Sequence, residues 1–278
     1  MLLTLTFPLA VSGAITAVYL RIVVVLVSVL ERNPVQVGYY VTSARIIENF
    51  VGLPMMLVGV ALPVLSVSAR DNLPRLRYAT AQMTQTMALL GALLAVVLGL
   101  GAHTVLTVLG GHTYAGAAGA LRIQCVMLVT LFSGAALATP LVGSARNREV
   151  ALATVSGLGF ASALAPVLIA PLGAEGAAIA AVGGDVMLCS GLFLAVRASG
   201  AGAAFRPGPF VRIALCAIVA AACGSLCSPT SVVAPAVGAT TLLVLAVAFG
   251  LVPSELLGPV RARAGRVRAA FDGLLDGR

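Results

Sequence analysis

Residues Ala17–Leu57 read AVYLRIVVVLVSVLERNPVQVGYYVTSARIIENFVGLPMML, which is two long apolar runs joined by a short polar turn. Each run carries charge where a membrane helix normally has none. Arg21 lies in the first run, and Arg45 and Glu48 lie in the second. A charged residue at bilayer depth costs about 2.5–3.5 kcal/mol on insertion scales. These three side chains are therefore expected to face a protein interior or a water-filled cavity rather than lipid.

The composition of the chain indicates a membrane protein with several crossings. Of its 278 residues, 60% are hydrophobic and 9% are charged, and the mean hydropathy is +1.09. An ordinary soluble domain has about 25% charged residues. All 17 basic residues are Arg, and the lack of Lys excludes a P-loop and a Schiff-base enzyme. No paired-carboxylate motif, nucleophile elbow or HExxH motif is present, so we expect no enzyme activity, no metal and no cofactor.

Apolar runs between polar breaks predict about eight membrane helices, because a crossing needs about 20 apolar residues. The predicted spans are Thr4–Leu30, Val37–Ser66, Thr84–Leu109, Gly116–Val142, Val150–Ala170, Gly176–Val196, Phe210–Leu226 and Val232–Leu251. The polar, basic stretch Ser68–Met87 is expected to form an amphipathic segment on the membrane surface. The fold class is thus an all-α, polytopic membrane helical bundle.

Arginines in the loops predict the orientation of this bundle. If the helices alternate, thirteen arginines fall on one side: Arg70, Arg75, Arg77, Arg146, Arg148, Arg197, Arg206, Arg212, Arg261, Arg263, Arg266, Arg268 and Arg278. The opposite side has only Arg32 and, near a helix end, Arg122. Loops rich in Arg and Lys stay in the cytoplasm. Both termini are therefore expected to be cytoplasmic, and the formal charge of +8 reflects membrane topology rather than nucleic-acid binding.

Charged residues of four predicted helices fall at similar depth. At about 1.5 Å per residue, Arg21, Arg45, Glu48, Arg122 and Asp185 all lie between the outer interface and the midplane. Arg45 and Glu48 are three residues apart, so they share a helix face and can pair. One interpretation is that the five charges neutralise one another as buried pairs. The other is an outward-leaning cavity with excess positive charge, since Arg binds phosphate well through its paired donors.

Several stretches resemble the polysaccharide and O-antigen flippases of the multidrug/oligosaccharidyl-lipid/polysaccharide exporter superfamily. They are YLRIVVVLVSVL at 19–30, VGYYVTSARI at 37–46, LPMMLVGVALPVLS at 53–66, LGGHTYAGAAGALRI at 109–123 and PLGAEGAAIAAVGGDVML at 171–188. Their order and spacing extend the resemblance over most of the chain. Family members are usually built from two six-helix halves that form a V, often with two extra helices. This chain looks like the second half plus those two.

The resemblance implies a domain organisation and a function. Residues 1–199 would form the half bundle, residues 200–252 the two additional helices, and residues 253–278 a basic amphipathic cytoplasmic tail. The protein would flip a polyprenyl-diphosphate-linked oligosaccharide across the bacterial plasma membrane by alternating access, for surface polysaccharide biosynthesis. Arg21, Arg45 and Arg122 would be the substrate contacts. Glu48 and Asp185 would form an ion-coupling or structural pair.

Two departures from the family pattern accompany this resemblance. Relatives often carry an acid two residues after the Arg that Arg21 matches, whereas this chain has Val23, which leaves Arg21 without a local partner. The first half of the transporter is also missing. We expect either that a partner chain supplies it or that Met1 is internal to a longer protein.

Two other functions stay open at this point. A cation-coupled exporter of small molecules from the same superfamily would use Asp185 or Glu48 as its acid. A non-transporting subunit of a polysaccharide assembly complex would need neither. In each case membrane lipids are partners, and nucleic acid is not.

Overall fold

The structure is a computed structural model that describes residues 21–60, 73–144, 146–199, 208–226, 233–249 and 251. These residues form helices and short connections, with no strand among them. Two helical segments without labels are Arg21–Leu30 and residues 52–60. The labelled helices in chain order are α2 (Pro34–Glu48), α4 (Leu73–Leu100), α5 (Ala102–Gly110), the 3-10 helix η1 (His112–Ala117), α6 (Ala118–Gln124), α7 (Val126–Gly143), α8 (Asn147–Ala198), α9 (Gly208–Leu226) and α10 (Val233–Ala248).

Several helices have the length and composition of membrane crossings. Within the described residues, five stretches qualify: Pro34–Val60, Tyr78–Leu100, Val126–Gly143, Asn147–Ala198 and Gly208–Ser225. Arg21–Leu30 and Val233–Ala248 are shorter apolar helices. The expected all-helical class, compatible with a membrane bundle, is therefore confirmed. The count of eight crossings and the V-shaped arrangement stay predictions, and the predicted tail at 253–278 lies outside the described residues.

The long helix α8 is a hairpin of two arms. Its backbone leaves the helical conformation at Gly173, where φ is 54° and ψ is −124°. This positive φ is readily adopted by glycine and is unfavourable for other residues. The arms lie so close that a Cβ on Gly157 would meet the Gly184 carbonyl oxygen at 2.8 Å. They correspond to the predicted helices Val150–Ala170 and Gly176–Val196.

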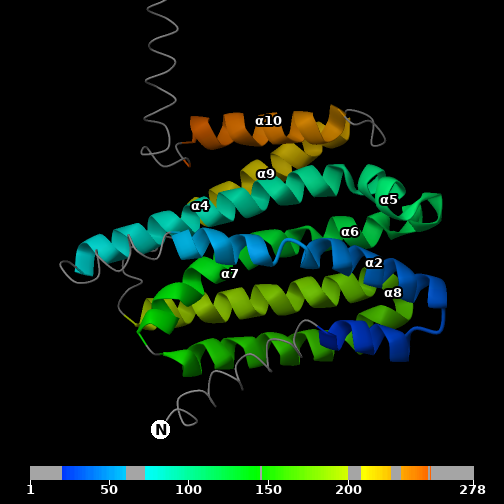
Figure 1. Ribbon diagram of the computed structural model, residues 1–278, viewed down its shortest axis with the longest axis horizontal. Helices are drawn as coiled ribbons and strands as arrows, with labels where there is room; N and C mark the ends of the chain where they lie inside the picture. Colours follow the sequence, from blue (N-terminus) through cyan, green and yellow to red (C-terminus); the bar gives the residue numbers. More distant parts are fainter. Residues whose placement is uncertain are drawn as a thin grey trace, which may run out of the picture.

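The helices pack side by side in one bundle (Figure 1). Helix α4 packs against α7 on one side and against α9 and α10 on the other, and α7 packs against α8. The two arms of α8 thus lie on one side of the bundle, and α10 lies on the opposite side (Figure 1). Val23 and Val27 of the segment Arg21–Leu30 pack in a cluster with Ala161 and Ala165 of α8. Helix α2 packs against α6 and α8, so the charged residues of both segments face the same part of the bundle.

Helix α4 corrects two expectations. The described part of the stretch Ser68–Met87 is the first half of α4 and not a separate surface segment. The Thr84 hydroxyl donates to the Thr80 carbonyl at 2.8 Å, and both residues are buried. Hydroxyls satisfied by their own helix in this way do not end it. The predicted helix Thr84–Leu109 is also two helices, because α4 ends at Leu100 and α5 begins after Gly101.

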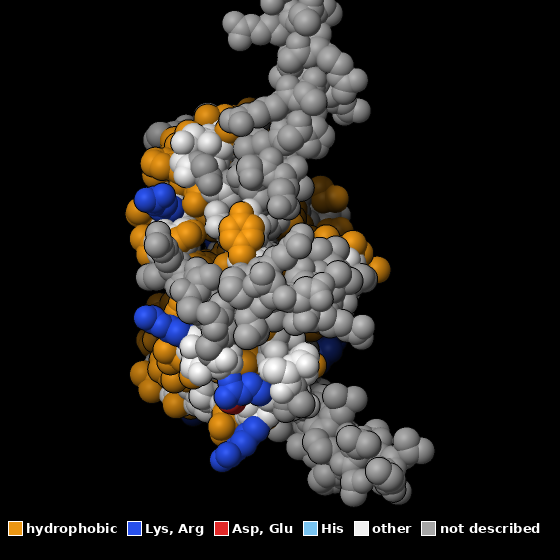
Figure 2. Space-filling view, turned by 90° about the vertical axis from the view of Figure 1, so that its left-hand side faces the viewer, with side chains coloured by type: hydrophobic (Ala, Val, Ile, Leu, Met, Phe, Trp, Pro, Cys, Tyr) orange, Lys and Arg blue, Asp and Glu red, His pale blue; other side chains and the backbone are white. Residues whose placement is uncertain are grey.

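Four arginines near helix ends in the described part of the chain lie at one end of the bundle. At this end α7 leads into α8, the second arm of α8 finishes, and α9 begins. Figure 2 views the molecule from the side on which these connections lie and shows arginine side chains among hydrophobic ones. The residues at these connections are Arg146, Arg148, Arg197 and Arg212. The cytoplasmic orientation expected from the arginines stays a prediction.

Candidate functional site

The candidate site begins at a break in the second membrane segment. Helix α2 ends at Glu48, and the chain is helical again from residue 52. Across the break, the Phe50 amide donates to the Ile47 carbonyl at 3.0 Å and the Val51 amide donates to the Glu48 carbonyl at 3.1 Å. Pro54, which has no amide hydrogen, lies in the first turn of the helical segment that follows the break. Broken helices are tolerated at membrane depth where they line a cavity.

Glu48 contacts two arginines at this break. Its carboxylate oxygens lie 3.4 Å from an Arg21 nitrogen and 3.2 Å from an Arg45 nitrogen. The Arg21 and Arg45 side chains are 51% and 61% exposed, and that of Glu48 is 24% exposed. The pair expected between Arg45 and Glu48 is therefore present. Arg21 also has a partner after all, but this partner comes from α2 and not from its own helix.

This triad of Arg21, Arg45 and Glu48 carries a net charge of +1. Ion pairs with exposed arginines contribute about 0–1 kcal/mol to stability, because water screens them. These three residues are therefore not a set of buried charges that neutralise one another. One carboxylate pairs with two guanidinium groups, and both arginine side chains are more than half exposed. The exposed donors remain accessible to a further anion.

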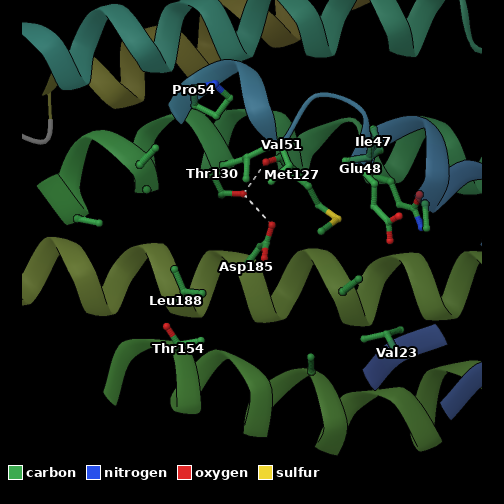
Figure 3. A pocket seen from close by; sticks show the side chains of 18 of the residues that line it. Val23, Ile47, Glu48, Val51, Pro54, Met127, Thr130, Thr154, Asp185 and Leu188 are labelled. Carbon is green, nitrogen blue, oxygen red and sulfur yellow. Dashed lines mark hydrogen bonds between the residues drawn. The ribbon is translucent and has the colours of Figure 1, made fainter. Parts of the chain in front are cut away.

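A cavity of about 250 Å³ lies inside the bundle next to the triad. Glu48 lines it from α2, Val51 from the break and Pro54 from the helical segment beyond it, and Asp185 lines it from the second arm of α8 (Figure 3). Asp185 is 9% exposed, and the Thr130 hydroxyl of α7 lies 3.4 Å from its carboxylate. Both acids predicted as an ion-coupling or structural pair thus line the same cavity, from two different helices.

Other polar residues, which the sequence pattern did not single out, also line this cavity. Gln124 of α6 lines the cavity at 1% exposure, and neither atom of its amide has a hydrogen-bond partner among the described residues. Tyr40 is 3% exposed, and Thr154 lies on the first arm of α8. A single Gln inside the apolar run LRIQCVM is the signal that could have identified Gln124, since polar residues within membrane segments tend to be functional.

Arg122 does not join the other predicted site residues. It lines a second, larger cavity of about 800 Å³ between α4, α7 and α9, and it forms no ion pair with any residue that the structure describes. A Cβ added to Gly99, near the end of α4, would lie 3.9 Å from the Cβ of Cys125, just after α6. Arg122 therefore lies level with the end of the apolar span Tyr78–Leu100 and not deep within it. The charged residues expected at one depth therefore belong to two separate sites, one beside the first cavity and one, Arg122, at the second.

Neither cavity is built like a metal centre. Among the described residues, no group of three or more His, Cys, Asp or Glu side chains could hold a metal ion. Four cysteines are free thiols: Cys125 lies between α6 and α7, Cys189 lies in α8, and Cys216 and Cys223 lie in α9. The chemistry available at the first cavity is therefore that of carboxylate, amide and hydroxyl groups inside and guanidinium groups at its edge.

The sequence matches no protein-family model and no curated protein.

Proposed function

We propose that this chain is part of a transporter that flips a polyprenyl-diphosphate-linked oligosaccharide across the bacterial plasma membrane by alternating access. The observation that carries the proposal is the triad, in which two arginines from separate helices meet at one carboxylate beside a cavity in an apolar helical bundle. The proposed role involves binding and movement without bond making or breaking. Both termini would lie in the cytoplasm, on the side of the arginine-rich end.

The chemistry of the triad suits a diphosphate. Each guanidinium group presents a planar fork of donors that matches phosphate oxygens. Glu48 holds Arg21 and Arg45 within reach of the same carboxylate, so one diphosphate can contact both arginines. Because the two guanidinium groups are already held in place, less conformational entropy is lost when the ligand binds. The polyprenyl chain would stay in the lipid while the charged group occupies the site.

The size of the first cavity supports a missing partner half. A volume of about 250 Å³ is smaller than the range of about 300–1,000 Å³ that is typical of small-ligand pockets. An oligosaccharide needs more room than such a pocket provides. The described bundle would therefore supply one wall of the substrate path, and a partner chain or a further segment would supply the other.

The test uses charge-neutralising variants at the triad. Arg21→Gln and Arg45→Gln each remove one charge-assisted contact, which is worth about 1.5–3 kcal/mol or roughly a factor of 10–100 in affinity. Binding of a radiolabelled polyprenyl diphosphate to the full chain in nanodiscs gives the affinity, and polysaccharide export in the producing cell gives the function. We expect both variants to insert normally, to bind at least about 10-fold more weakly and to stop export.

Arg32→Gln is the matched control, because Arg32 is exposed in the turn before α2 and forms no ion pair with another described residue. It should bind and export like the wild type. Normal binding and export by both triad variants at normal abundance would remove the basis of the proposal.

A second candidate function is supported by the acids on the cavity wall. Glu48 and Asp185 would suit a cation-coupled exporter of small molecules, which needs an intramembrane carboxylate. Asp185→Asn distinguishes the two functions. Loss of drug resistance with unchanged polysaccharide export favours the exporter, and the reverse result favours the flippase.

A further inference from the structure

The second cavity is bordered by three helices and is partly open. Helix α4 contributes mostly small side chains at helical spacing: Ala88, Ala92, Ala95, Val96 and Gly99. Helix α9 contributes a stripe on one face that remains largely exposed: Phe210, Ala214, Ile218, Ala222 and Ser225. Val126 and Val129 of α7 form the third side. The small residues on α4 leave an apolar groove of about 800 Å³ that no described side chain fills.

The charge on this groove has one sign. Arg122 lies at one end, near Gly99 and Ser225, and Phe210 lies at the other. No acidic residue is among the described residues that line the groove. Arg122 is exposed and forms no ion pair with another residue in the described ranges. An occupant that complements the groove needs a long apolar part and an anionic group at one end.

The position of Arg122 also limits the occupant. Arg122 lies level with the end of the apolar span Tyr78–Leu100, where the headgroup region of a bilayer begins. A guanidinium group binds phosphate oxygens through its parallel N–H donors, and so suits a phospholipid headgroup. An apolar groove that opens into the hydrocarbon core of the bilayer can admit an acyl chain directly from the lipid. Neither the groove nor the chain is then exposed to water. A lipid whose phosphate meets Arg122 therefore has its acyl chain directed along α9 toward Phe210.

We propose that this groove is a binding site for one anionic phospholipid of the bilayer, with its phosphate on Arg122 and an acyl chain between α4, α7 and α9. The lipid fills space that the two additional helices α9 and α10 leave open against the rest of the bundle. It is a resident component of the protein and not the transported molecule. The site is separate from the Arg21–Arg45–Glu48 triad, so its failure leaves the proposed function untouched.

Native mass spectrometry of the full chain, purified in mild detergent, tests the site. Phosphatidylglycerol, phosphatidylethanolamine and a polyprenyl diphosphate are added separately and then in equimolar competition. We expect one tightly retained phosphatidylglycerol, preferred over phosphatidylethanolamine. Arg122→Gln should reduce its affinity about 10-fold, because a charge-assisted contact to phosphate is lost. Arg212→Gln, on α9 but outside the groove lining, should retain the lipid.

A steric pair of variants tests the acyl chain. Ala222→Phe places a large ring in the groove, whereas Val219→Phe places one on an exposed face of α9 outside the groove lining. Both positions are exposed, so both variants should fold. Only Ala222→Phe should lose the retained lipid. The proposal is overturned if Arg122→Gln retains phosphatidylglycerol as well as the wild type does. It is also overturned if Ala222→Phe and Val219→Phe retain the lipid equally. Displacement of phosphatidylglycerol by equimolar polyprenyl diphosphate also overturns it and assigns the groove to the transported lipid.

Discussion

Glu48 is the residue on which the geometry of the candidate site depends, because its carboxylate contacts both Arg21 and Arg45. Its side chain is partly exposed, so the ion pairs do little for stability. Their role in our proposal is positional. They keep two guanidinium groups from separate helices within reach of one ligand.

Glu48→Gln separates the charge of this carboxylate from its positional role, because the Gln amide oxygen can still accept hydrogen bonds from the guanidinium groups. Removing the carboxylate raises the net charge of the triad from +1 to +2, so a polyprenyl diphosphate should bind more tightly at low salt. We expect a gain of about 3–10-fold that shrinks as salt rises, because exposed charges are screened. Transport should fall, since a tightly held substrate is released slowly. Equilibrium binding in nanodiscs at two ionic strengths measures the effect, and an affinity that is unchanged at both contradicts it.

Gln124 presents the opposite case of a buried polar group without a partner. Its amide atoms have no hydrogen bond within the described part of the chain, and the residue is 1% exposed. A buried unpaired amide costs about 1–3 kcal/mol. Such a group persists where it serves a ligand or ordered water.

Gln124→Met replaces the amide with an apolar group of similar size. The variant should be as stable as the wild type or more stable by up to about 2 kcal/mol, because an unpaired polar group is removed. Gln124→Ala should instead be destabilised, because it leaves a void. Unfolding of the purified protein in mixed micelles compares the three proteins. A Met variant less stable than the Ala variant would mean that the amide is paired.

At the scale of single elements, the α8 hairpin depends on backbone contact between its arms. A Cβ on Gly157 would meet the Gly184 carbonyl oxygen at 2.8 Å, whereas a Cβ on Gly159 would meet nothing within 4 Å. Small residues at such contacts let membrane helices approach closely. Because Asp185 follows Gly184 directly, this contact also positions the deepest acid of the first cavity.

Gly157→Ala and Gly159→Ala form a matched pair on the same arm. Gly157→Ala should destabilise the protein by about 1–3 kcal/mol, because the arms must separate to admit the methyl group. Gly159→Ala should be neutral or stabilising by up to about 1 kcal/mol, from its better helix propensity. Unfolding in mixed micelles provides the comparison, and equal effects at the two positions would show that the arms are not in contact.

The turn between the arms depends on Gly173 in the same way. Its φ of 54° is strained for any side chain, and a Cβ there would lie 3.0 Å from the Gln36 side-chain oxygen. That oxygen accepts a hydrogen bond from the Ala174 amide at 3.2 Å, which ties α2 to the turn. Gly173→Ala should therefore cost about 1–3 kcal/mol in the same unfolding measurement. Gly38→Ala, where a Cβ meets nothing within 4 Å, serves as its control and should be tolerated.

At the scale of the whole molecule, the ends of the bundle differ in charge. Arg146, Arg148, Arg197 and Arg212 lie where α7, α8 and α9 begin or end, and the Gly173 turn lies at the other end. Because loops rich in arginine stay in the cytoplasm, the end with these four arginines is expected to face inward.

Single cysteines introduced at each end test this topology. Arg148→Cys should react with a membrane-impermeant maleimide only after the cells are opened, and His112→Cys should react in intact cells. The native cysteines at 125 and 216 are buried and provide little background, and the unsubstituted chain serves as the control. Reaction of both introduced cysteines from the same side would contradict the alternating arrangement.

The sequence alone predicts those features that depend on local pattern. Apolar runs identify the helical membrane class, and the bounds expected for the arms of α8 and for α9 and α10 lie within a few residues of the structure. The i,i+3 spacing correctly indicates the pair between Arg45 and Glu48. Local pattern fails at α4, because polar residues satisfied within their own helix continue it rather than end it.

The composition and periodicity of this chain thus determine by themselves that it is an all-helical protein suited to a membrane, and which charges lie within the helices. The tertiary structure alone decides which of those charges meet. Arg21 reaches Glu48 because Val23 and Val27 pack its helix against α8, beside α2. Arg122 faces a different groove because helix packing, and not depth along the chain, sets the direction of a side chain. The local sequence determines which residues share a face of a helix. Which helices pack against that face depends on contacts between residues far apart in sequence.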